Sequence, residues 1–192
     1  MNLLYFTLIF SLLYSLIEIE VEGKYGWMEK AYSVGVLKTG GKNFTVYHIY
    51  MILVLILIYA YLTNLRMDMK SIGRFLFHIT LFLLLEDFLW FVFNPHYTLE
   101  KYSKEEIWWH ADQPWFKGIP LHNITGTLIL LLLTVFNTDI FYTDMVKTFA
   151  FTLICIFSAK YYHKFYNSIR EDKLDQEDNL NQEEMKQDVI DI

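Results

Sequence analysis

The chain has 192 residues, of which 54% are hydrophobic and 18% aromatic, and its formal net charge is −6. A composition this apolar, with the apolar residues clustered in runs, excludes an ordinary soluble domain. The single cysteine, Cys155, excludes an intramolecular disulfide framework and a cysteine-ligated zinc site. The sequence has no basic patch interleaved with aromatic residues, so nothing in it indicates a nucleic-acid partner.

Membrane-spanning runs dominate the sequence. A span needs about 20 apolar residues to cross a hydrocarbon core of about 30 Å. We predict spans at about residues 3–19, 44–62, 72–93, 119–136 and 146–161. No basic residue precedes the apolar core of the first run, so we interpret it as a retained span and not as a cleaved signal peptide. The fold class predicted for residues 1–167 is therefore an all-α, polytopic membrane bundle of five helices, or four.

Two polar segments flank these spans. The linker between the third and fourth spans is rich in tryptophan, which is typical of a segment at the membrane interface. A second interpretation of this linker is a lid over a polar site, formed by Trp108, Trp109, His110 and Asp112. Residues 168–192 form an acidic tail without aromatic residues, which we expect to be solvent-exposed and either disordered or a loose helix.

The lysine and arginine residues of the connections predict the orientation. With the N-terminus outside and the C-terminus cytoplasmic, most of them fall on the cytoplasmic face, as the positive-inside rule requires. Arg66, Lys70 and Arg74 argue against this orientation, because they lie close together in a short loop on the outer side.

Two adjacent carboxylates, Glu86 and Asp87, lie inside the third predicted span. A charged side chain at the centre of a membrane helix costs about 2.5–3.5 kcal/mol, so each needs a partner. Adjacent helical residues point about 100° apart, so the two carboxylates cannot face one neighbour. Antiparallel spans would bring further polar residues to the same, cytoplasmic, membrane face: Glu18, Glu22, His48 and His122.

Histidine and carboxylate ligands suit zinc, iron or manganese, and a bound metal would activate a water molecule. The residues predicted to bind such a metal are His48, Glu86, His122, Glu18 and Glu22, with Glu86 and Asp87 as the catalytic residues. Glu18 and Glu22 could hold one cation if the first helix continues through them, whereas an extended strand would align Glu18, Glu20 and Glu22 instead. The alternative to a metal site is a set of structural hydrogen bonds and ion pairs.

These observations lead to one main hypothesis and two alternatives. The main one is a membrane-embedded, metal-dependent enzyme that acts on a lipidic substrate. The alternatives are a proton- or cation-coupled carrier and a non-catalytic accessory subunit of a membrane complex. Membrane lipids are the expected partners, together with a second copy of the chain or another membrane subunit.

Overall fold

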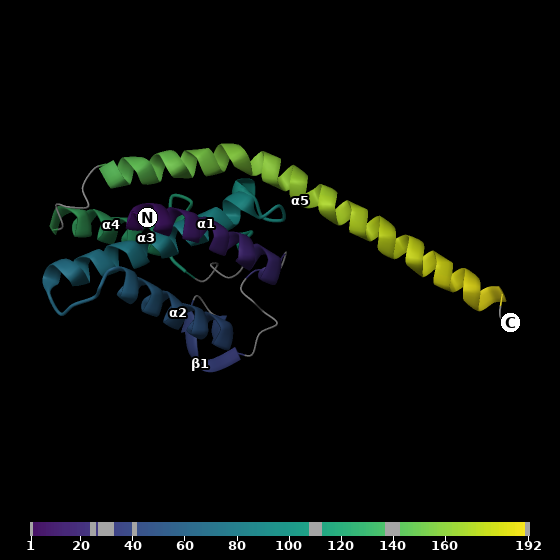
Figure 1. Ribbon diagram of the computed structural model, residues 1–192, viewed down its shortest axis with the longest axis horizontal. Coiled ribbons are helices and arrows are strands. Elements are labelled where there is room, and N and C mark those ends of the chain that lie inside the picture. The colour runs from purple at the N-terminus through teal and green to yellow at the C-terminus, as the bar shows by residue number, and fades with distance from the viewer. Residues whose placement is uncertain are drawn as a thin grey trace.

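The computed structural model describes residues 2–23, 26, 33–39, 42–107, 113–136 and 143–190. This part of the chain is mostly helical, as Figure 1 shows, and each of its α-helices overlaps one predicted span. The helices are α1 (Leu3–Glu22), α2 (Val46–Leu62), α3 (Met69–Phe93), α4 (Leu121–Phe136) and α5 (Thr143–Ile190). The all-α class is confirmed at this level.

Among the described residues, two helices have the length and composition of a membrane span. They are α1, with 20 residues, and α3, with 25 residues. The apolar helices α2 and α4 are shorter, and at 1.5 Å per residue they measure about 26 and 24 Å. The number of five spans therefore remains a prediction.

Two short antiparallel hairpins add strands that the sequence analysis did not predict. Strand β1 (Ser33–Thr39) pairs with β2 (Lys42–Thr45), and β3 (Trp115–Phe116) pairs with β4 (Ile119–Pro120). The second strand of each hairpin leads directly into a helix, so α2 and α4 begin two residues later than their predicted spans. A 3-10 turn, η1 (Leu99–Lys101), lies in the linker after α3.

Helix α1 packs against α3 through a stripe of small side chains. Thr7, Ser11 and Ser15 are buried and lie four residues apart, on one face of the helix. Side chains of this size let two helix backbones approach closely, as in other membrane bundles. The Thr7 hydroxyl also lies 3.1 Å from His78 Nδ1 of α3, which joins the two helices by a buried polar contact.

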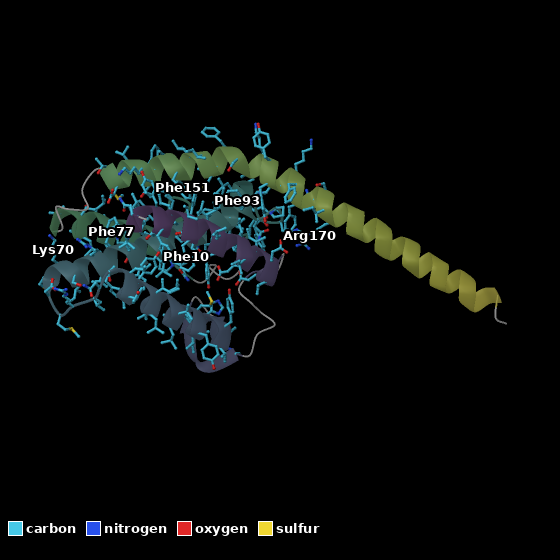
Figure 2. All side chains as sticks on the ribbon, viewed as in Figure 1. Phe10, Lys70, Phe77, Phe93, Phe151 and Arg170 are labelled. Carbon is cyan, nitrogen blue, oxygen red and sulfur yellow. The ribbon has the colours of Figure 1, made fainter. Side chains whose placement is uncertain are left out.

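The core is centred on α3, which contributes more buried residues than any other described helix, among them Phe77 and Leu89. Figure 2 shows side chains filling the space between the helices, with Lys70 and Arg170 at opposite ends of the bundle. At the end marked by Arg170, the Asn94 side chain donates a hydrogen bond to the Gly23 carbonyl at 3.2 Å. This contact ties the end of α3 to the end of α1.

Helix α5 runs along the bundle and then beyond it (Figure 1). Where it leaves the bundle, the Arg170 guanidinium forms an ion pair with Glu20 of α1 and lies over the Tyr166 ring, 4.2 Å from the ring centroid. The backbone remains helical to Ile190, through the acidic segment.

Candidate functional site

Glu86 and Asp87 of α3 lie at the end of the bundle where α1 ends and where α2 and α4 begin. Tyr47, in the first turn of α2, donates a hydrogen bond to Glu18 Oε1 of α1 at 3.1 Å. Asp87 of α3 lies 3.8 Å from His122, in the first turn of α4. Four helices separated in sequence therefore contribute polar side chains to one region.

A carboxyl pair connects α1 with α3. Glu18 of α1 and Glu86 of α3 lie close together, with Tyr14 beside Glu18. Tyr47 donates its hydrogen bond to Glu18, whereas the Tyr14 hydroxyl donates to Met51 Sδ at 2.6 Å. Two carboxylates in contact repel each other when both are ionised, so such a pair needs a shared proton or a cation. Helix α1 continues to Glu22, which decides between the two interpretations of this segment in favour of the helix.

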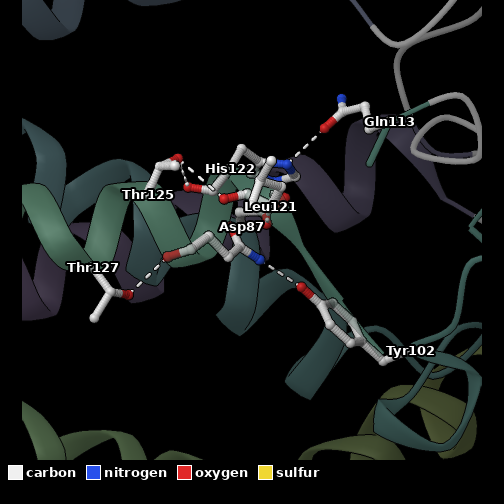
Figure 3. A network of polar contacts seen from close by, with 8 residues as sticks. Asp87, Tyr102, Gln113, Leu121, His122, Thr125 and Thr127 are labelled. Atoms are coloured by element: carbon white, nitrogen blue, oxygen red, sulfur yellow. Dashed lines mark hydrogen bonds and ion pairs between the residues drawn. The ribbon is translucent and has the colours of Figure 1, made fainter. Parts of the chain in front are cut away.

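The neighbouring carboxylate faces α4 instead. Asp87 Oδ2 lies 3.8 Å from His122 Nε2, and His122 Nδ1 lies 2.6 Å from Gln113 Oε1 (Figure 3). An amide oxygen only accepts hydrogen bonds, so His122 Nδ1 carries the proton. In the neutral imidazole the other nitrogen, Nε2, is then a proton acceptor that faces Asp87. Glu86 and Asp87 face different neighbouring helices, as expected because adjacent residues of a helix point about 100° apart.

Asn123 extends this network towards the linker after α3. Its amide nitrogen donates to the Tyr102 hydroxyl at 2.6 Å (Figure 3), while its Oδ1 is buried and accepts no hydrogen bond from the residues that the structure describes. Burial, and then the negative charge of Asp87, raise the pKa of the Tyr102 phenol above its usual range. Tyr102 therefore stays a neutral hydroxyl at physiological pH.

A cleft of about 450 Å³ lies beside these residues. Among the described residues, its polar lining includes Glu86, Asp87, Gln113, His122 and Asn123, together with Thr80. Its described apolar lining includes Leu83 and Leu84 of α3, Gly126 of α4 and Phe44 of β2. A Cβ atom at Gly126 would stand 2.8 Å from a Leu84 methyl group, so the glycine allows the two helices to approach closely at the cleft.

Comparisons with protein-family models, curated proteins and solved structures found no match to this chain. The function is therefore argued from the cleft and its side chains.

The other predicted site residues have separate positions. His48 Nδ1 lies 2.6 Å from the Thr45 hydroxyl, at the residue before α2. Glu22 is the last residue of α1, about one turn beyond Glu18. The proposed lid residues lie outside the described residues: Trp108, Trp109, His110 and Asp112.

Among the described residues there is no group of three or more His, Cys, Asp or Glu side chains that could hold a metal ion. Metal ligation by His48, Glu86, His122, Glu18 and Glu22 thus remains a prediction without structural support.

Sequence reasoning missed the uncharged members of the two networks. Gln113, Tyr102, Tyr14 and Tyr47 make the contacts described above, yet none of them is unusual in a sequence with 14 tyrosines. The one available signal was the position of Asn123 beside His122 at the start of a predicted span.

Proposed function

We propose that the protein is a multi-pass membrane protein in which α2, α4 and α5 also cross the bilayer. The support is the exposure of large apolar side chains along all three helices, a pattern that a soluble surface does not tolerate. The most exposed of these include Leu53 and Leu57 of α2, Leu132 and Val135 of α4, and Phe149, Ile154 and Phe157 of α5. Because α2 and α4 are shorter than the hydrocarbon core, the bilayer thins around them or their flanking residues reach the interface.

The proposed orientation places the N-terminus outside and the C-terminus in the cytoplasm. The end of the bundle that carries the cleft then faces the cytoplasm, together with the larger share of lysine and arginine. The turn between α2 and α3, with Arg66, and the first residues of α3, with Lys70 and Arg74, are then on the outer side.

Within this arrangement, the proposed activity is that of a membrane-embedded enzyme acting on an amphipathic, lipidic substrate. One observation carries the proposal: the apolar wall of the α3–α4 cleft leads to a histidine and a carboxylate that face each other. The wall would hold a hydrocarbon chain, while the polar end would hold the headgroup. Pockets of this size, mostly apolar with a few polar groups, are typical ligand sites.

His122 and Asp87 would carry out proton transfer. An N–H or O–H group of the substrate would give its proton to His122 Nε2, since Gln113 holds the proton on Nδ1. The imidazolium formed in this step would lie beside the Asp87 carboxylate, which stabilises its positive charge. Glu86 lines the same cleft and would add negative charge near the reacting group.

The test is turnover of a total lipid extract by the full chain in lipid nanodiscs, followed by mass spectrometry. We expect the wild-type protein to consume a lipid from the extract. Asp87→Asn should consume the same lipid about 10²–10⁴-fold more slowly. Asp144→Asn is the matched control, because Asp144 pairs with Lys147 at the start of α5, away from the cleft. Equal turnover by both variants would contradict the assignment of Asp87.

The Glu18–Glu86 contact favours a second candidate, a proton-coupled carrier. Carboxyl groups inside a membrane bundle often form part of a proton path, and this pair has two tyrosine hydroxyls beside it. In this case Glu86→Gln would abolish proton flux into liposomes and leave the protein folded. Unchanged flux would exclude the pair from any proton path.

A further inference from the structure

The charge of the cleft indicates which headgroup it can accept. Among the described residues that line it, the ionisable side chains are Glu86, Asp87 and His122, and there is no lysine or arginine. A headgroup with a negative charge would meet two carboxyl groups and, among these described residues, no fixed cation. The electrostatic potential of this site therefore favours a positively charged ligand.

The hydrogen-bonding groups of the cleft point to the same class of ligand. Asn123 Oδ1 is a buried acceptor without a hydrogen-bond donor among the described residues, and such an atom costs free energy until a donor reaches it. The carboxylate oxygens of Asp87 are further acceptors in the same lining. A ligand that carries several N–H donors would give Asn123 Oδ1 its missing donor and would add a further donor to the Asp87 carboxylate.

The kind of cation follows from the aromatic content of the lining. Quaternary ammonium groups, which have no N–H donor, are bound by cages of several aromatic rings. Phe44 is the one aromatic residue in the described lining of this cleft. A protonated primary amine, with three N–H donors, fits the acceptors better than a trimethylammonium group does.

The remaining part of the cleft is apolar. Leu83 and Leu84 form its wall on α3, and Gly126 leaves space on α4 because it has no side chain. Leu83 is 45% exposed, so the wall is open at the surface of the bundle and a hydrocarbon chain could enter from the surrounding lipid.

We propose that the α3–α4 cleft binds an amphipathic primary amine, a lipid or long-chain compound whose ammonium group lies between Asp87 and Asn123. This inference rests on the proposed function and names the substrate class of the same cleft. Bound there, the ammonium group lies within the same lining as His122, the residue to which the proposed function assigns proton acceptance.

The test measures binding of dodecylamine to the full chain in nanodiscs of zwitterionic lipid by isothermal titration calorimetry. Three probes with the same chain serve as references: dodecyltrimethylammonium, dodecanol and dodecanoate. We expect dodecylamine to bind saturably and at least about tenfold more tightly than any reference compound. A difference of this size is within the range that charge-assisted hydrogen bonds contribute. Asp144→Asn should bind dodecylamine as the wild type does.

Two substitutions with opposite expected effects on binding distinguish a change in affinity from a loss of folding. Asp87→Asn removes a charge and should weaken dodecylamine binding about tenfold or more, whereas Asn123→Asp adds a charge and should tighten it. Dodecanol or dodecanoate binding as tightly as the amine would overturn the amine proposal and leave the lipid-binding cleft intact. If none of the four compounds binds saturably, the amine proposal and the proposed lipid cleft both fail. If the turnover experiment instead identifies a substrate lipid without an amine, only the amine proposal is contradicted.

Discussion

His122 Nε2 of α4 lies 3.8 Å from Asp87 Oδ2 of α3, while Gln113 fixes the proton on the opposite ring nitrogen. This relationship places a proton acceptor and a carboxylate side by side at the polar end of a cleft with an apolar wall. It is the basis of the proposed acid–base chemistry.

Gln113 should act by positioning His122 and not by reacting itself. Replacing it by Glu puts a negative charge 2.6 Å from Nδ1, which favours the protonated imidazole. The pH–rate profile of Gln113→Glu should therefore be displaced to higher pH relative to that of the wild type. Gln113→Ala should lower the rate without this displacement. Identical pH profiles for both variants and the wild type would show that Gln113 does not influence His122.

Arginine substitutions should test whether α2 and α4 face lipid. Leu57 of α2 and Leu132 of α4 are 69% and 58% exposed. An arginine at either position should cost about 2.5–3.5 kcal/mol of membrane insertion free energy, because it must be placed in hydrocarbon. Met67→Arg is the control, since Met67 lies in the turn after α2. The measurement is the fraction of chain that resists alkaline extraction from membranes. Full resistance of Leu57→Arg and Leu132→Arg would contradict membrane spanning by these helices.

The close approach of α1 to α3 should make Ser11 sensitive to size. Ser11→Leu forces a large side chain into a fully buried position and should lower the free energy of unfolding by about 1–3 kcal/mol. Ser11→Ala keeps the size and should change it by less than about 1 kcal/mol. Thermal unfolding in detergent measures both variants. A wild-type unfolding temperature for Ser11→Leu would mean that α1 is not packed against α3 in the mature protein.

Gly126 should be more important for binding than for stability. Gly126→Ala improves the helix propensity of α4 by about 1 kcal/mol, and the flexible end of Leu84 can move away from the new methyl group. The moved side chain then occupies cleft space, so ligand binding should weaken while the unfolding temperature changes little. The double variant Leu84→Ala/Gly126→Ala should recover binding. If the double variant binds as weakly as Gly126→Ala, the contact with Leu84 is not the cause.

The hydropathy of the sequence and the alternating direction of consecutive helices predicted much of this architecture. Every predicted span overlaps a helix, and the alternation of helix direction brings Glu18, Glu86 and His122 to one end, as expected. The partners of each side chain were not predictable, because a helix that is apolar on all sides does not show which face its neighbours cover. Glu86 meets Glu18, and Asp87 meets His122, only after the helices are rotated and packed.

The hairpin before α2 escaped prediction for a different reason. The stretch from Ser33 to Thr45 contains glycine and lysine but no clean alternation of polar and apolar residues, so it reads as a loop at the membrane surface. The pairing of β1 with β2 is local, because only two residues separate Thr39 from Lys42. The Gly40-Gly41 dipeptide at this position is the hairpin signal that sequence reasoning could have used.

The most direct measurement of the central claim is a double-mutant cycle on Asp87 and His122, read as turnover of the lipid substrate. Each of Asp87→Asn and His122→Gln should lower the rate about 10²–10⁴-fold. Because the two residues act as one unit, the double variant should be no slower than the slower single variant. If the two losses multiply in the double variant, Asp87 and His122 act independently, and the account of a coupled acid–base pair is wrong.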